Sequence, residues 1–299
     1  MFPSFLTTVL FSFSVIFASR SARVLGGPVA NLSRLMVAML VLGLWAHLFG
    51  GGMRGPALPW FLAGGVIGFG FGDMALFGAL TRIGPRLSIL LTQCLAAPIA
   101  VAAEWLWLRT SLSAVEMLCA VAILGGVALA LAPDHGWEGD RRTFWWGVIF
   151  GICSALGQGL GAVFTRKAFE VSKAAGVDID GGTAAYQRIV GGVVITWLCF
   201  LILRQTRPDD YRMPEAKAWK RAGGAVVGNA MAGPAIGVAC FQWALKSTPS
   251  GIVLPIVATS PLVTMLLAWY FDQIRPSRRA AWGGVIAVAG AAALKYSHG

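Results

Sequence analysis

One carboxylate lies deep within an apolar stretch of the sequence. Asp73 stands in Gly70-Phe-Gly-Asp-Met-Ala, past the middle of a membrane helix predicted at 57–81. An ionisable side chain at a membrane helix centre costs about 2.5–3.5 kcal/mol on insertion scales, so it needs a function or a partner. Asp73 can bind a substrate ammonium group or carry a proton. It can equally be the structural partner of Arg34 or of a neighbouring hydroxyl group.

Two arginines lie about one helical turn inside predicted helices. Arg34 is near the start of the helix predicted at 29–49, and Arg188 is near the start of the one at 183–204. Each can contact a carboxylate, or it can pin a helix end through backbone carbonyl groups. Pro98 and Pro261 lie in the middle of their predicted helices and each removes a backbone hydrogen bond, so they are predicted kinks or hinges.

The remaining candidates are amides and aromatic side chains inside apolar runs. A side-chain amide can bind both ends of a zwitterion because it donates and accepts; it can equally bridge two helices, at about 0.6 kcal/mol. Aromatic rings can form an apolar wall, although Trp is typical of the membrane interface. The candidate substrate-binding residues are Asp73, Gln93, Gln158, Asn229, Gln242, Trp243, Phe77 and Tyr186.

The composition is that of a polytopic membrane protein. Of the 299 residues, 57% are hydrophobic and 12% are charged, against about 25% charged residues in soluble domains. This excludes a soluble enzyme, a disordered chain and a secreted disulfide scaffold. The net charge of +11 does not indicate a nucleic-acid partner, because the basic residues fall mostly between apolar runs, where they set membrane orientation.

The cysteines and histidines do not form a metal motif. The five cysteines are widely spaced without a CxxC pair, and the three histidines are far apart, whereas a metal site needs clustered ligands. We therefore expect free, buried cysteines, no metal and no cofactor.

Ten membrane helices are predicted, because a bilayer core of about 30 Å takes about 20 apolar residues as helix. The first is kept as a helix although it ends like a signal peptide, since no basic side chain precedes its apolar run. Glu104 and Lys167, near span ends, are expected to extend toward the interface. The predicted spans are 2–20, 29–49, 57–81, 86–108, 113–132, 144–167, 183–204, 222–245, 250–271 and 279–297.

The two halves of the chain carry similar elements in the same order. Arg34 and Arg188 open the second span of each half, and an Ala-Leu pair, a Pro-containing turn, an apolar run and then Pro98 or Pro261 follow in both. Five spans per half make the second half enter the membrane from the opposite side. The expected organisation is one five-helix repeat at 1–133, a connecting loop at 134–143 and an inverted repeat at 144–299, a pattern typical of secondary transporters.

Rows of small residues predict close helix contacts. Gly64-xxx-Gly68-xxx-Gly72 lies in the third span and Gly224-xxx-Gly228 in the eighth. Small residues at this spacing let two backbones approach.

These features resemble the EamA-type family of the drug/metabolite transporter superfamily, over roughly residues 1–297, and most of all its bacterial amino-acid exporters, aromatic amino-acid exporters included. The resemblance implies a multi-pass inner-membrane protein that functions as a monomer, with a central cavity lined by helices 1, 3, 4, 6, 8 and 9. It favours a structural or gating role for the two arginines, since the family carries them with unlike substrates. The Gly-Glu pair that often follows helices 4 and 9 is absent; Arg109-Thr110 and Asp272-Gln273 stand there.

The function expected is export of amino acids or related small metabolites by alternating access, not catalysis. The alternative is a membrane-embedded enzyme or flippase acting on a lipid-linked substrate, for which Asp209-Asp210, in a basic loop, is the one acidic pair. Spans 1 and 6 contain no Asp or Glu, which leaves proton coupling, exchange and facilitated diffusion open.

The loop charges and the resemblance disagree on orientation. Odd-numbered connections hold 15 Lys and Arg, and the others with the C-terminus hold 7, which by the positive-inside rule places both termini outside. The resemblance implies cytoplasmic termini. Both alternatives stay open.

Overall fold

The regular elements in the described chain are all helices. The computed structural model describes residues 1–132, 140–206, 213–272 and 277–297; most of the predicted 134–143 loop and the Asp209-Asp210 pair lie outside them. The helices, with η marking a π-helix, are α1 (Phe2–Leu25), α2 (Gly27–Leu48), α3 (Leu58–Gly65), η1 (Val66–Gly72), α4 (Asp73–Trp107), α5 (Ala114–Leu131), α6 (Arg141–Ala174), α7 (Gly181–Thr206), α8 (Ala216–Ala230), η2 (Met231–Ala235), α9 (Ile236–Ser247), α10 (Ser250–Val257), α11 (Ser260–Asp272) and α12 (Arg278–Ser297).

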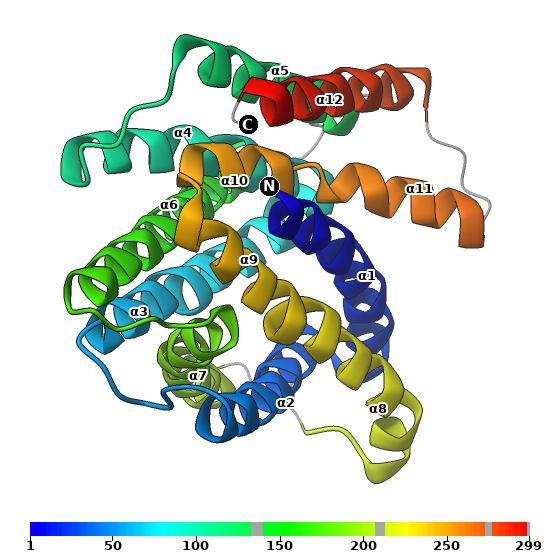
Figure 1. The fold of residues 1–299 in the computed structure, drawn as a ribbon. Helices are drawn as coiled ribbons and strands as arrows, with labels where there is room; N and C mark the ends of the chain where they lie inside the picture. Colours follow the sequence, from blue (N-terminus) through cyan, green and yellow to red (C-terminus); the bar gives the residue numbers. More distant parts are fainter. Residues whose placement is uncertain (133–139, 207–212, 273–276, 298–299) are drawn as a thin grey trace.

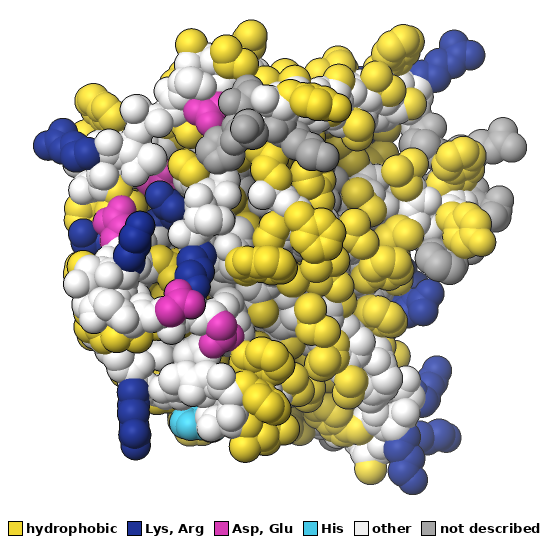
Figure 2. Space-filling model, in the orientation of Figure 1, with side chains coloured by type: hydrophobic (Ala, Val, Ile, Leu, Met, Phe, Trp, Pro, Cys, Tyr) yellow, Lys and Arg dark blue, Asp and Glu magenta, His cyan; other side chains and the backbone are white. Residues whose placement is uncertain are grey.

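The outer surface of these helices is apolar. Leu40, Leu118 and Val288 expose 68%, 70% and 65% of their surface, and hydrophobic side chains spread over much of the face in Figure 2. Among the described residues, eight helical runs are long and apolar enough to cross a membrane. A contiguous apolar exterior of this kind is matched by lipid rather than water. The predicted all-helical membrane protein is confirmed.

One continuous run is too long for a single crossing. It spans 58–107, or 50 residues, which as helix reaches about 75 Å. Gly84 interrupts it with φ 74° and ψ 168°, and Pro85 follows. The left-handed φ is one that glycine adopts without strain, so the chain turns at the point where the predicted spans 57–81 and 86–108 are separated.

Three segments depart from regular α-helix where apolar helices meet in the interior. The π-helices η1 and η2 interrupt the α3–α4 and α8–α9 runs, and the chain breaks between α10 and α11 at Ala258 and Thr259. Pro261 follows this break directly, whereas Pro98 lies inside α4, on its exposed side. Such π segments are frequent at functional sites.

The helices pack as pairs around a shared interior (Figure 1). α4 packs along α6, α1 along α8 and α9, α2 along α7, and α5 along α12. The Gly64, Gly68, Gly72 row faces α6: a Cβ atom built on Gly157 would lie 2.5 Å from the Cα of Gly72. The close contact predicted for this row is therefore confirmed.

The second glycine row packs more loosely. A Cβ atom on Gly228 would meet the Phe17 ring at 3.1 Å, but one on Gly224 would have no described heavy atom within 4 Å. The contact predicted for Gly224 is wrong.

Side-chain caps begin four of the described helices, among them α12, where the Ser277 hydroxyl accepts the Ala280 N–H. Ser113 and Glu116 form a reciprocal capping box on α5, and the Asp140 carboxylate accepts the Thr143 N–H on α6. Asp180 does the same for α7 and also accepts the indole N–H of Trp45. This last cap therefore ties the end of α2 to the start of α7.

Candidate functional site

A cavity of about 250 Å³ lies between the packed helices. Residues from both halves of the chain line it, so it lies where the two predicted repeats meet. Its polar and aromatic lining residues are Phe11, Ser14, Arg34, Phe69, Asp73, Thr92, Gln93, Ser154, Gln158, Arg188, Phe241 and Ser260.

Asp73 and Arg34 form an ion pair in this lining. Arg34 Nη2 lies 3.5 Å from Asp73 Oδ2, and Arg34 Nε donates to Asn31 Oδ1 at 2.8 Å. Asp73 is the first residue of α4, directly after η1, and its Oδ2 accepts no hydrogen bond from a described residue. The pair links α2 to α4 in the lining of the cavity.

Arg188 brings a second guanidinium to the cavity from α7. The residue is 5% exposed, and its Nη1 donates to Thr165 Oγ1 at 3.2 Å. Its Cζ lies 5.4 Å from the Phe69 ring centroid and 5.9 Å from that of Phe241. In the described chain Arg188 Nε has no hydrogen-bond partner.

Two of the predicted amides face each other. Gln158 Nε2 on α6 donates to Gln93 Oε1 on α4 at 2.9 Å, and both residues line the cavity. Asn229 is buried outside the lining, where its Oδ1 accepts the Ser14 hydroxyl at 2.7 Å. Both amide contacts join two helices in the state described.

The remaining candidates lie elsewhere. Gln242 is fully buried, and among described residues both its amide atoms lack a partner. Trp243 is 50% exposed, Phe77 is half-buried, and Tyr186 packs on the ring of His47. The structure thus brings Asp73, Gln93, Gln158, Arg34 and Arg188 to the cavity, but not Asn229, Gln242, Trp243, Phe77, Tyr186, Pro98 or Pro261.

Hydroxyl groups of α1 form a feature that sequence reasoning missed. The Thr8 hydroxyl lies 3.0 Å from the Ser4 carbonyl and 3.1 Å from the Ile256 carbonyl. The Ser12 hydroxyl lies 2.7 Å from the Thr8 carbonyl and 2.9 Å from the Ser260 carbonyl. Each hydroxyl proton is therefore shared between an acceptor within α1 and one outside it. The Ile256 and Ser260 carbonyls flank the break between α10 and α11. The available signal was the spacing of four residues between hydroxyl side chains in an apolar helix, which places them on one face.

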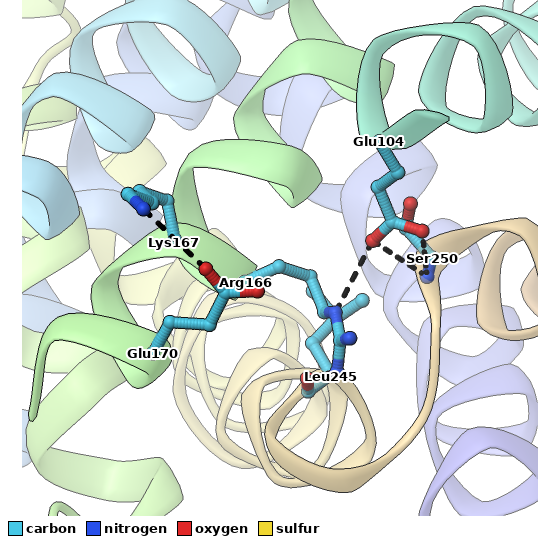
Figure 3. Close-up of polar contacts among 6 residues, drawn as sticks. All are labelled: Glu104, Arg166, Lys167, Glu170, Leu245 and Ser250. Atoms are coloured by element: carbon cyan, nitrogen blue, oxygen red, sulfur yellow. Dashed lines mark hydrogen bonds and ion pairs between the residues drawn. The ribbon is translucent and has the colours of Figure 1, made fainter. Parts of the chain in front are cut away.

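A buried ionic network lies near the ends of four helices (Figure 3). Glu104 of α4 is 2% exposed; its Oε1 lies 3.2 Å from Arg166 Nε on α6, and its two oxygens accept the Ser250 N–H at the start of α10. Arg166 Nη1 donates to the Leu245 carbonyl near the end of α9. The expectation that Glu104 extends toward the interface is wrong, because Arg166 pairs with it inside the protein.

A larger hollow opens on the surface, with Arg166 in its lining. It has a volume of about 1110 Å³, between the ends of α6 and α9 and the start of α7. Figure 2 shows charged side chains of both signs gathered on one part of this face, beside a wide apolar area. Trp243 belongs to this hollow rather than to the cavity. Its charged lining residues are Arg166, Glu170, Lys173, Asp178, Asp180 and Lys246.

Asp180, at the rim of this hollow, is held ionised. Partial burial acts to raise the pKa of its carboxyl group. Hydrogen bonds from Thr183, Trp45 and Gly182 stabilise the charged form and outweigh burial, so the pKa lies below its usual value. The carboxylate therefore caps α7 throughout the neutral range.

Metal-ligating side chains do not converge in the part of the chain that the structure describes: no group of three His, Cys, Asp or Glu could hold an ion there. The chemistry available to the cavity is thus ion pairing, hydrogen bonding and aromatic contact.

Comparisons with known proteins point to transport. The model of a family described as "EamA-like transporter family" matches residues 145–296. A solved structure described only as "Crystal structure of protein" is similar in fold, with a TM-score of 0.77 at 16% identity, over 98% of this chain and 96% of that one. No curated protein matches the sequence.

Proposed function

Because the chain belongs to the EamA-like transporter family, we propose that it is a secondary transporter that exports amino acids or related small metabolites across a bacterial inner membrane. The observation that carries the proposal is the cavity between the packed helices, which holds charges of both signs inside an apolar protein. Charged groups at membrane depth are costly and mark substrate or ion pathways.

The proposed architecture is ten membrane helices in two inverted five-helix repeats. Its support is that corresponding elements have corresponding irregularities: η1 interrupts the third predicted span and η2 the eighth. The packing is also reciprocal, since α1 packs on α8 and α9 while α6 packs on α3 and α4. If each helix is replaced by its counterpart in the other half, with α1 matched to α6 and α3–α4 matched to α8–α9, the same contacts result. Sites at such a repeat interface are typical of secondary transporters.

We propose alternating access with the Glu104–Arg166 network as the closure at one end. Arg166 is a little over two helical turns beyond the cavity residue Gln158 on α6, or about 12 Å. The network joins α4, α6, α9 and α10, each of which also lines the cavity or is continuous with a lining segment. Opening this end requires the Glu104 carboxylate to separate from Arg166 and the Ser250 N–H. The charged hollow then becomes the entrance to the cavity.

The cavity suits a small polar solute. Its volume of about 250 Å³ is below the range of about 300–1,000 Å³ typical of sites for drug-sized ligands. Asp73, two arginines and a pair of amides offer partners for both ends of a zwitterion, and Phe11, Phe69 and Phe241 offer an apolar wall.

A flux assay tests the function. The purified protein is reconstituted in liposomes loaded with unlabelled amino acids, and exchange of labelled amino acids is measured against protein-free liposomes. We expect accelerated exchange of at least one of the twenty, with a dependence on internal solute. A full panel without exchange above the control would remove the proposal.

A further inference from the structure

The charges that line the cavity do not cancel. Arg34 and Asp73 pair with each other, while Arg188 lies beyond 4.0 Å of every carboxylate in the described chain; the lining therefore has one positive charge in excess. Arginine stays protonated in proteins, so this charge cannot be relieved by loss of a proton, as it could for a buried lysine.

The contacts of Arg188 in the described chain include no ion pair. Removing an ion from water is costly even after relaxation. Two aromatic rings and the Thr165 hydroxyl contact the guanidinium, and none of these groups carries a negative charge. An anionic partner is the group that completes this site.

The guanidinium packs against two glycine residues, Gly68 and Gly161. A Cβ atom on Gly68 would come within 2.7 Å of Arg188 Nη2, and one on Gly161 within 2.8 Å. Glycine at these two positions therefore makes the space that the side chain occupies. Nη1 is engaged by Thr165, whereas Nε is buried and has no described partner, so the Nε donor is the one left unsatisfied.

We infer that Arg188 binds an anionic group of the substrate, and that the substrates of this protein are carboxylates or zwitterions rather than cations. This inference deepens the proposed transport function and rests on it. Arginine matches a carboxylate with two parallel N–H···O bonds. A zwitterion places its carboxylate at Arg188 and its ammonium near the carboxylate of Asp73, whereas an amine without a carboxylate leaves the excess positive charge uncompensated.

The test is equilibrium binding to the purified protein in detergent, because small acids and amines cross lipid unaided. Two matched sets are compared: phenylalanine with hydrocinnamate and phenethylamine, and leucine with isocaproate and isopentylamine. Each set varies the charged groups and keeps a similar apolar body. We expect the amino acid and the acid of at least one set to bind, and its amine to bind at least about tenfold more weakly.

Variants connect this selectivity to one side chain. Arg188→Gln is expected to weaken binding of the acid by about tenfold to a hundredfold, the value of a charge-assisted hydrogen bond, without weakening the amine; Arg188→Lys is expected to fall between. Arg82→Gln is the matched control. Arg82 also lies over an aromatic ring, that of Phe150 at 4.7 Å, but outside the cavity.

The outcomes separate the two proposals. If an amine binds as tightly as the acid of its set, the inference is overturned and the proposed transport function still stands. The same conclusion follows if neither acid binds although the flux assay is positive. If Arg188 were only structural, Arg188→Gln would lower stability and weaken all ligands alike, so an unchanged acid-to-amine ratio also overturns it. If Arg188→Gln does not fold, the acid-to-amine affinity ratios of Arg188→Lys and of the wild type still test the inference.

Discussion

At the scale of single residues, the Asp73–Arg34 pair has two separable roles, which are stabilising the fold and contacting the substrate. Asp73→Asn leaves Arg34 without its carboxylate, so we expect lower stability and loss of amino-acid exchange. The double variant Asp73→Asn with Arg34→Gln removes both charges and is expected to recover most of the stability, since an unpaired buried charge costs more than no pair. Thermal unfolding and liposome exchange are measured on the wild type, the single variant and the double variant.

Exchange by the double variant distinguishes binding from support. If Asp73 contacts the substrate ammonium, exchange stays low although stability returns. Recovery of exchange with stability would assign Asp73 a purely structural role, and full exchange by Asp73→Asn alone would dismiss it from the mechanism.

The buried Glu104 carboxylate gives a second prediction. Glu104→Gln leaves Arg166 uncompensated inside the protein, and breaking such a buried pair costs about 3–5 kcal/mol. The matched control is Glu170→Gln, which removes the partially exposed pair with Lys167, a contact worth about 0–1 kcal/mol. Denaturant unfolding in detergent is the measurement; equal effects of the two substitutions would contradict the network.

The depth of a charged residue could be read from the sequence, but the partner of Glu104 could not. Asp73 is costly wherever it lies in its apolar run, so its importance and its possible pairing with Arg34 followed from position alone. Glu104 lies near a predicted span end, where a charge can reach water. Its burial depends on Arg166, which is on another helix and far along the chain, and no spacing rule connects them.

At the scale of elements, the hydroxyl row of α1 is expected to hold the broken helix α10–α11. Thr8→Val and Ser12→Ala together remove two donors to carbonyls that flank the break. An unsatisfied buried polar group costs about 1–3 kcal/mol, so we expect a lower thermal midpoint. Ser33→Ala is the control, because the hydrogen bond of the Ser33 hydroxyl to a described residue stays within α2, at the Val29 carbonyl; a comparable loss there would contradict the prediction.

The Asp180 cap gives a pH-dependent prediction. Its pKa is lowered in the folded protein, so its contribution is complete above the unfolded value of about 3.9 and is lost as the pH falls through the folded value. Asp180→Ala is therefore expected to lower stability by about 1 kcal/mol at neutral pH, with a difference from wild type that shrinks below about pH 4. Thermal midpoints measured between neutral and acid pH test this; a difference independent of pH would contradict it.

Helices could be predicted from the sequence where the length of an apolar run and the turn residues beside it determine where the helix begins and ends. The Pro85 turn separates two spans in the sequence, and Gly84 makes it in the structure. The π segments and the break at Ala258–Thr259 were not predicted. They depend on which carbonyl groups find donors from other helices, such as Thr8 and Ser12, and hydropathy does not contain that information.

At the scale of the whole molecule, the cavity and the hollow are expected to open to opposite sides of the membrane. Single cysteines placed in a cysteine-free background can report this: Ser154→Cys in the cavity lining and Ser247→Cys in the hollow. With Glu104 intact, a membrane-impermeant thiol reagent should label the two variants faster from opposite faces. The side of the membrane from which Ser247→Cys is labelled also gives the orientation of the protein, on which the loop charges and the family resemblance disagree.

Disruption of the network should change that pattern in one direction. Adding Glu104→Gln to the Ser154→Cys variant is expected to raise the rate of labelling from the hollow side, because the ends of α4, α6, α9 and α10 are no longer joined there. Adding Glu170→Gln instead should leave the rates unchanged. Faster labelling of Ser154→Cys from the hollow side than from the other side with Glu104 intact would show that the network does not close a passage. If Glu104→Gln leaves the labelling unaltered, the alternation between two open states does not pass through this end of the molecule.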